Sequence, residues 1–195
     1  FSGELLECGS VKFTRNVSLN VDGNCREGRE IAEIFASSGL NSIADDRIEA
    51  TEWSKFTGWI PLFALSILTR SPIGQFLSTR EFALQTYLLI REVAALAEKN
   101  QVILHDDTVL PVLRLANSEE RYAVQELLAI GEDFRDKFPN HKISALQDLK
   151  NKKRLEVHET LGHVLEMAAK LGVPLGISPF YYKLIAGLDE MNQPR

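Results

Sequence analysis

The spacing of hydrophobic positions changes near residue 47 of this chain. Before that point, apolar and polar side chains alternate along residues 5–21, a period of two that predicts β-strands with one exposed face. The apolar members of this alternation are Val11, Phe13, Val17, Leu19 and Val21. A polar and charged stretch at 26–38 then reads as a helix, with Asn24 as its N-cap and Gly39 as its left-handed end. Residues 40–44 follow as a short extended segment, so the expected order is β-β-α-β.

From residue 47 onward the apolar positions recur with helical spacing. The pattern predicts helices at about 48–69, 73–77, 80–100, 118–138, 144–151, 156–171 and 178–190. Pro61 lies inside the first of them and predicts a kink, because proline removes a backbone donor. Thr79, Ser118 and Ser178 are expected at helix starts. The fold class is therefore mainly α, with residues 1–46 and 47–195 as two domains.

Composition narrows the classes of function. The 195 residues are 45% hydrophobic and 25% charged, with a formal net charge of −5, which argues against a general nucleic-acid surface. No apolar run reaches the roughly 18 residues that span a bilayer. Cys8 and Cys25 lack metal-ligand spacing and are expected as free thiols in the cytoplasm, with a disulfide between them as the alternative.

Two segments carry candidate chemistry. The first places the hydroxyl of Ser144, a basic run at 150–154 and the carboxylate of Glu156 within thirteen residues, ahead of an amphipathic helix that stops at Pro174. The second is Trp53-Ser54-Lys55 near the start of the 48–69 helix. It is followed by Trp59 and Phe63, four and eight residues after the lysine.

Together these segments resemble the ketopantoate reductases (2-dehydropantoate 2-reductases). That family reads roughly S-x-L-Q-D-L, a basic linker and T-E-I-D, and it opens its C-terminal domain with W-x-K. The resemblance implies a helical domain of the 6-phosphogluconate-dehydrogenase-like type at 47–195, preceded by the end of a Rossmann-like domain. It also implies NADPH-dependent reduction of 2-dehydropantoate in pantothenate biosynthesis, a small 2-keto acid as substrate, and a homodimer formed through the helical domain.

The resemblance assigns roles to three residues. Lys55 would be the catalytic acid, because an ammonium group stabilises the oxygen that becomes an alkoxide and then supplies its proton. Glu156 would be the partner carboxylate, and Ser144 would hydrogen-bond the substrate. Trp59 and Phe63 stand where the family has two asparagines, so as substrate-binding residues they make this helix face more apolar. A reductase paralogue for a more apolar 2-keto acid is therefore the alternative.

Each assignment has a purely structural alternative. Lys55 could be a solvated lysine on an amphipathic helix, and Glu156 could simply favour a helix dipole. Ser144 is also a good N-cap. The basic run at 150–154 is interpreted as a solvated linker between helices. The alternative is that its positive charge attracts an anionic substrate or a cofactor phosphate.

Other kinds of site find little support in the sequence. His158 and His163 are five residues apart, about 140° on an α-helix, so they do not read as a zinc pair. The chain has no G-x-S-x-G, no P-loop and no G-x-G-x-x-G. NADP(H) is therefore expected to be bound mainly by a missing N-terminal half, and the Phe1 start suggests a piece of a longer protein. The competing hypothesis is a non-catalytic helical module for dimerisation or ligand binding.

Overall fold

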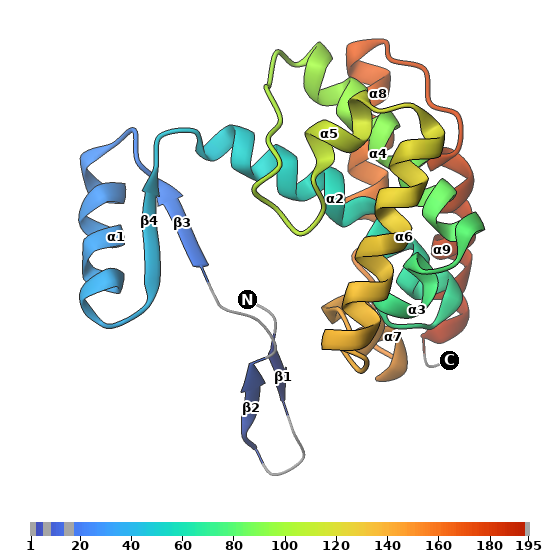
Figure 1. Cartoon of the computed structure of the whole chain (residues 1–195), viewed down its shortest axis with the longest axis horizontal. Coiled ribbons are helices and arrows are strands. Elements are labelled where there is room, and N and C mark those ends of the chain that lie inside the picture. The colour runs from blue at the N-terminus through green and yellow to red at the C-terminus, as the bar shows by residue number, and fades with distance from the viewer. Residues whose placement is uncertain (1–2, 6–8, 14–17, 194–195) are drawn as a thin grey trace. The chain divides into compact units, whose positions relative to one another are not determined.

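The computed structural model describes residues 3–5, 9–13 and 18–193 (Figure 1). The chain separates into two compact units, residues 1–52 and residues 53–195. Cys8 lies outside the described residues, as do the ends of the chain. Cys25 is a free, exposed cysteine.

The first unit contains two separate two-stranded sheets. Strands β1 (Gly3–Leu5) and β2 (Val11–Phe13) pair antiparallel. Strands β3 (Ser18–Asp22) and β4 (Asn41–Asp45) pair parallel and are connected through helix α1 (Arg26–Ser37). The order is β-β-β-α-β, one strand more than the sequence predicts, because Gly3–Leu5 forms an additional strand that pairs with Val11–Phe13.

Helix α1 begins differently from the sequence prediction. Its N-cap is Cys25, whose Sγ accepts the backbone N–H of Gly28 at 3.3 Å. The Asn24 side chain instead donates to the carboxylate of Asp22 at 2.9 Å, so the prediction that Asn24 caps this helix was wrong. The other end is as predicted, because Gly39 follows the helix with a φ of +88°.

The described residues of the second unit form helices and their connections, with no strand. Helix α2 (Ile48–Thr69) begins in the last residues of the first unit and continues through Pro61. The other elements are α3 (Ile73–Leu77), α4 (Arg80–Lys99), α5 (Val112–Asn117), α6 (Glu120–Lys137), α7 (Ser144–Lys150), the π-helical turn η1 (His158–Gly162), α8 (His163–Leu171) and α9 (Ser178–Asn192). The sequence prediction missed α5 and the π-helical turn.

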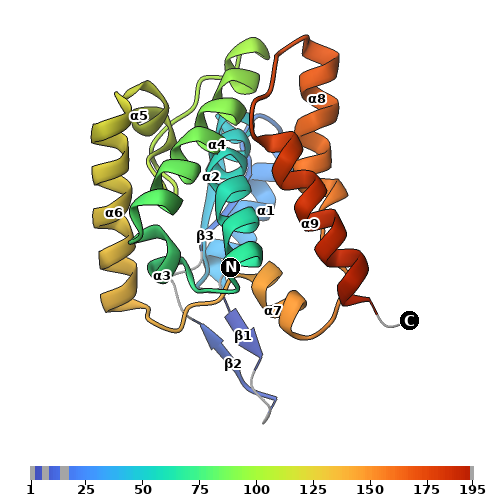
Figure 2. The same cartoon turned by 90° about the vertical axis from the view of Figure 1, so that its right-hand side faces the viewer.

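The core of the second unit lies around α2 and α4. Residues Ile60 to Ile67 of α2 are buried on every side, which is expected of a helix that other helices surround. Figure 2 shows α2 and α4 between α6 on one side and α8 and α9 on the other. A buried helix of this kind fixes the backbone near its start, where Lys55 lies.

Candidate active site

Lys55 lies on α2, and the two aromatic residues predicted beside it share its helix face. The Lys55 side chain is exposed, Trp59 is half-buried, and Phe63 is only 1% exposed within the core. The face at positions i, i+4 and i+8 therefore passes from solvent into the core. Phe63 can influence a ligand on this face only through the residues that cover it.

The start of α2 within the second unit is fixed by a buried hydrogen bond. Ser54, the neighbour of Lys55, is fully buried, and its hydroxyl accepts the backbone N–H of His105 at 2.9 Å. A second hydroxyl on the same helix, that of Thr57, donates to the carbonyl of Trp53 at 2.8 Å. Because Ser54 is buried and bonded, the backbone that carries Lys55 has little freedom to move.

Glu156 is exposed between two buried neighbours, Leu155 and Val157. The backbone N–H of Leu155 donates to the carboxylate of Asp189 on α9 at 2.8 Å. The carbonyl of Glu156 accepts the backbone N–H of Thr160 at 3.1 Å. Hydrogen bonds therefore fix the backbone around Glu156, while its exposed side chain lies outside the core.

The segment after Glu156 is not the regular α-helix that the sequence predicts. The backbone N–H of Gly162 donates to the carbonyl of Val157, five residues earlier, at 2.9 Å. The angle of about 140° between His158 and His163 assumed a regular α-helix, and this assumption does not hold across the wider turn. Such π-helical turns occur frequently at functional sites.

The two histidines make different contacts. Nδ1 of His158 lies 2.9 Å from the hydroxyl of Tyr182 on α9. The ring of His163 meets that of Phe56 edge-on, with 5.9 Å between centroids. Among the described residues, no cluster of three or more His, Cys, Asp or Glu could hold a metal ion.

The Phe56–His163 contact connects the two predicted catalytic segments. Phe56 follows Lys55 directly on α2, and His163 begins the helix that follows Glu156 and the π-helical turn. The hydrogen bonds and ion pairs of the described residues include none between Lys55 and Glu156. Their pairing across one cleft therefore stays a prediction.

Ser144 is the first residue of α7, and its side chain is exposed. The N-cap position belongs to Ile143, so the structural alternative that Ser144 caps this helix was wrong. The helix is held by buried Leu146 and by a hydrogen bond from Gln147 Nε2 to the carbonyl of Lys142 at 2.9 Å. The Ser144 hydroxyl remains accessible to a ligand.

Glu92 on α4 is a residue that the sequence prediction missed. Its carboxylate accepts the backbone N–H groups of Gly176, Ile177 and Ser178 at 2.7, 2.6 and 3.0 Å. It also accepts the Ser178 hydroxyl at 2.5 Å. A carboxylate at a helix N-terminus satisfies otherwise unpaired donors and favours the helix dipole, so Glu92 anchors α9. The sequence offered one hint of this contact: the first turn of α9 has no acidic residue of its own, so a carboxylate from elsewhere can occupy that helix end.

The strand–helix–strand of the first unit does not fit the phosphates of a dinucleotide. Its turn between β3 and α1 is lined by acidic side chains rather than by open backbone. Asp22 accepts the backbone N–H of Asn24 at 2.9 Å, and a Cβ at Gly23 would lie 2.6 Å from Oδ1 of Asp46. A phosphate would meet like charge here instead of free N–H groups.

Comparison with known proteins identifies the family. The family described as "Ketopantoate reductase PanE/ApbA C terminal" matches residues 47–189. No curated protein sequence shows a significant match to this chain.

Solved structures share the fold across nearly the whole chain. A dimeric ketopantoate reductase from Staphylococcus aureus has a TM-score of 0.74 and 15% identity, covering 98% of this chain and 59% of that one. A PanE/ApbA family ketopantoate reductase from Ralstonia eutropha JMP134 has a TM-score of 0.75 and 22% identity, covering 99% and 58%. A D-mandelate dehydrogenase in complex with NADH has a TM-score of 0.75 and 19% identity, covering 95% and 59%.

This chain thus spans less than two thirds of the length of these structures. The described residues include no helix that is both long and apolar enough to cross a membrane. Since the family match extends over most of the chain and coincides with the helical unit, the chain belongs to the ketopantoate reductase family.

Proposed function

We propose that residues 47–195 form the substrate-binding and catalytic domain of a cytoplasmic, NADPH-dependent 2-keto acid reductase. The observation that carries this proposal is the family match over residues 47–189, which includes both Lys55 and Glu156. The Phe56–His163 contact supports it, because it joins the helix of Lys55 to the segment that follows Glu156. Residues 1–46 would be the end of the nucleotide-binding domain.

Lys55 acts on the carbonyl oxygen in this proposal. Reduction of a 2-keto acid adds hydride to the carbonyl carbon, and the oxygen gains negative charge as it does so. The ammonium group of Lys55 stabilises that charge and then donates the proton, while the exposed carboxylate of Glu156 orients the resulting hydroxyl. Ser144 donates a hydrogen bond to the substrate carboxylate from the start of α7.

The nucleotide is assigned to another part of the complete protein. The chain has no glycine-rich loop, and the acidic turn between β3 and α1 does not suit phosphate. The reduced nicotinamide supplies the hydride when it is bound there. The residues of this chain bind and orient the keto acid and hold the transferred proton.

The substrate depends on the face formed by Lys55, Trp59 and Phe63. Tryptophan and phenylalanine offer no carbonyl or amide oxygen in place of the family's asparagines, and indole can only donate a hydrogen bond. The half-buried Trp59, on the same helix face as the buried Phe63, favours a bulkier or more apolar 2-keto acid. Ketopantoate, in pantothenate biosynthesis, is the second candidate. Assembly as a homodimer is proposed by analogy with the dimeric Staphylococcus aureus enzyme.

Steady-state kinetics of the complete protein test this assignment. Ketopantoate and a panel of branched and aromatic 2-keto acids are compared, with NADPH oxidation as the readout. The Trp59→Asn variant is expected to lose turnover of the apolar substrates without gaining ketopantoate. The control is Tyr122→Asn, which removes an exposed aromatic ring from α6 and should leave the kinetics unchanged.

Two other results of these kinetic measurements would contradict the proposal. Ketopantoate as the best substrate of the wild type, with Trp59→Asn no better, would end the altered-substrate proposal. No reduction of any 2-keto acid by the complete, folded protein would favour a non-catalytic helical module.

A further inference from the structure

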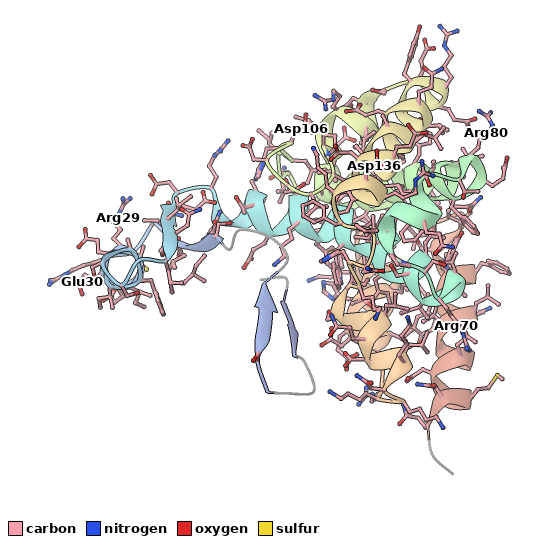
Figure 3. All side chains as sticks on the ribbon, turned by 60° about the horizontal axis from the view of Figure 1, so that its bottom comes forward. Arg29, Glu30, Arg70, Arg80, Asp106 and Asp136 are labelled. Carbon is pink, nitrogen blue, oxygen red and sulfur yellow. The ribbon has the colours of Figure 1, made fainter. Side chains whose placement is uncertain are left out.

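The ends of three helices converge on a pocket that the proposed active site does not use. The pocket has a volume of about 310 Å³ and is lined by Arg70, Leu149, Lys150, Lys152 and Asn192. Arg70, labelled in Figure 3, directly follows the end of α2. Asn192 ends α9 and donates from Nδ2 to the carbonyl of Leu149 on α7 at 3.3 Å, which holds these two helix ends together.

The basic run at 150–154 divides into two groups. Lys153 pairs with Asp148 at 3.7 Å, and Arg154 pairs with Glu159 at 3.1 Å. Lys150 and Lys152 line the pocket instead. Within the described part of the chain, neither of them nor Arg70 has an ion pair or a side-chain hydrogen bond.

The charge balance at the pocket favours an anion. The three helix C-termini contribute about −0.5 elementary charge each, or roughly −1.5 in total, against three positive side chains. None of the described residues that line the pocket is acidic. Asp148 faces Lys153, and Asp189 accepts from the backbone of Leu155 and from Gln193 Nε2. A net positive charge therefore remains at the pocket.

Two of the cationic residues that line the pocket have an unusual backbone conformation, which supports a ligand site here. Arg70 and Lys152 have φ values of 53° and 55°, the left-handed conformation that glycine adopts at lower cost. Both positions nevertheless carry a cationic side chain that points into no described ion pair. Residues held in such conformations are concentrated at ligand sites and switch regions.

We propose that this pocket binds a small, free phosphate-bearing anion. The planar guanidinium of Arg70 suits two oxygens of one phosphate, and the two lysines act as point charges around it. Arg70 lies about 22 Å along the helix from Lys55 at the rise of an α-helix, so this site is separate from the proposed catalytic one. The inference does not depend on the proposed reductase activity.

Calorimetric titration of the chain with inorganic pyrophosphate tests the proposal, with ionic strength held constant by sodium chloride. Wild type is expected to bind. Lys152→Gln and Arg70→Gln should each weaken binding about tenfold, as expected for loss of a charge-assisted contact. The control is Lys99→Gln, which removes an exposed lysine at the end of α4 that does not line the pocket, and which should change the affinity less than about twofold.

A second variant separates binding from folding. Lys152→Gly removes the charge but lets glycine adopt the left-handed backbone freely, so its melting temperature should equal or exceed that of the wild type while binding is weakened. No binding by the wild type above the salt control would overturn the proposal. So would an equal loss in Lys99→Gln, which would indicate a diffuse surface effect. NADPH binding more tightly than pyrophosphate would assign the site to the cofactor instead.

Discussion

The ring of Phe56 on α2 packs edge-on against the imidazole of His163 on α8, with 5.9 Å between the ring centroids and 75° between the planes. Phe56 also meets Trp53 edge-on at 6.4 Å, so the aromatic contact continues along α2. This contact sets the distance between the backbone that carries Lys55 and the helix that follows Glu156. The geometry of the proposed catalytic pair therefore depends on it.

A double-mutant cycle at Phe56 and His163 measures this contact. Edge-to-face pairs of this kind contribute about 0.5–1.5 kcal/mol beyond the burial of their surfaces. The effects of Phe56→Leu and His163→Leu on the free energy of unfolding should therefore be non-additive by about that amount. The control cycle combines His163→Leu with Phe180→Leu, an exposed ring on α9, and should be additive. Additivity in the first cycle would show that the contact does not couple α2 to α8.

Glu92 is predicted to stabilise the fold through α9. Glu92→Ala leaves three backbone donors and the Ser178 hydroxyl without their acceptor and should lower the free energy of unfolding by about 2–4 kcal/mol. Glu98→Ala, an exposed glutamate on the same helix, should change it by less than about 0.5 kcal/mol. Chemical denaturation of both variants provides the comparison, and equal losses would refute the anchoring role.

The first unit should lose stability in acid through Asp45. The Thr51 hydroxyl donates to its carboxylate at 2.6 Å, and this hydrogen bond is the main cause that holds the pKa of Asp45 below its ordinary value. Because the pKa is lower in the folded state, the stabilisation is present above about pH 4 and is lost as the pH falls through the folded value.

Thr51→Val is expected to raise the pKa of Asp45 toward its ordinary value, since it removes the main donor. A carboxyl NMR titration of Asp45 measures the change, with Thr79→Val, an exposed threonine on another helix, as the control. An unchanged titration of Asp45 in Thr51→Val would contradict the assigned cause.

The sequence predicted the helical unit well because its signals are local and strong. The apolar periodicity of 80–99 and 120–137 and the glycine at 172 each act within a few residues, and these helices end close to the predicted positions. The starts were less predictable. At α1 the sulfur of Cys25 takes the place expected for Asn24.

The arrangement of the candidate site was less predictable still, because it depends on contacts between residues far apart in the sequence. The motifs locate Lys55 and Glu156 in the sequence, but the Phe56–His163 contact joins residues more than a hundred positions apart. The contact between Glu92 and Ser178 spans 86 residues, so the start of α9, which has no acidic residue of its own, cannot reveal which residue supplies the carboxylate. The π-helical turn at 158–162 packs against α9, where Nδ1 of His158 lies 2.9 Å from the hydroxyl of Tyr182, and a helical period cannot reveal this contact.

The chain of 195 residues alone is predicted to bind NADPH weakly or not at all. It has no glycine-rich loop, and the turn between β3 and α1 presents carboxylates. Calorimetry with NADPH, beside the complete protein as the positive control, gives the comparison. Micromolar affinity of the 195-residue chain would contradict the proposal that the nucleotide binds mainly outside these residues.

The most direct test of the catalytic proposal is the turnover of Lys55→Ala in the complete protein, measured on the best 2-keto acid found for the wild type. Loss of the proton donor and of its charge should lower kcat by about 10²-fold or more. Lys55→Arg should rescue little, because a guanidinium keeps the charge but does not release its proton. Lys170→Ala, an exposed lysine on α8, should turn over like the wild type. Lys55→Ala with a kcat within about threefold of the wild type would contradict the account, since general acid catalysis contributes far more than that.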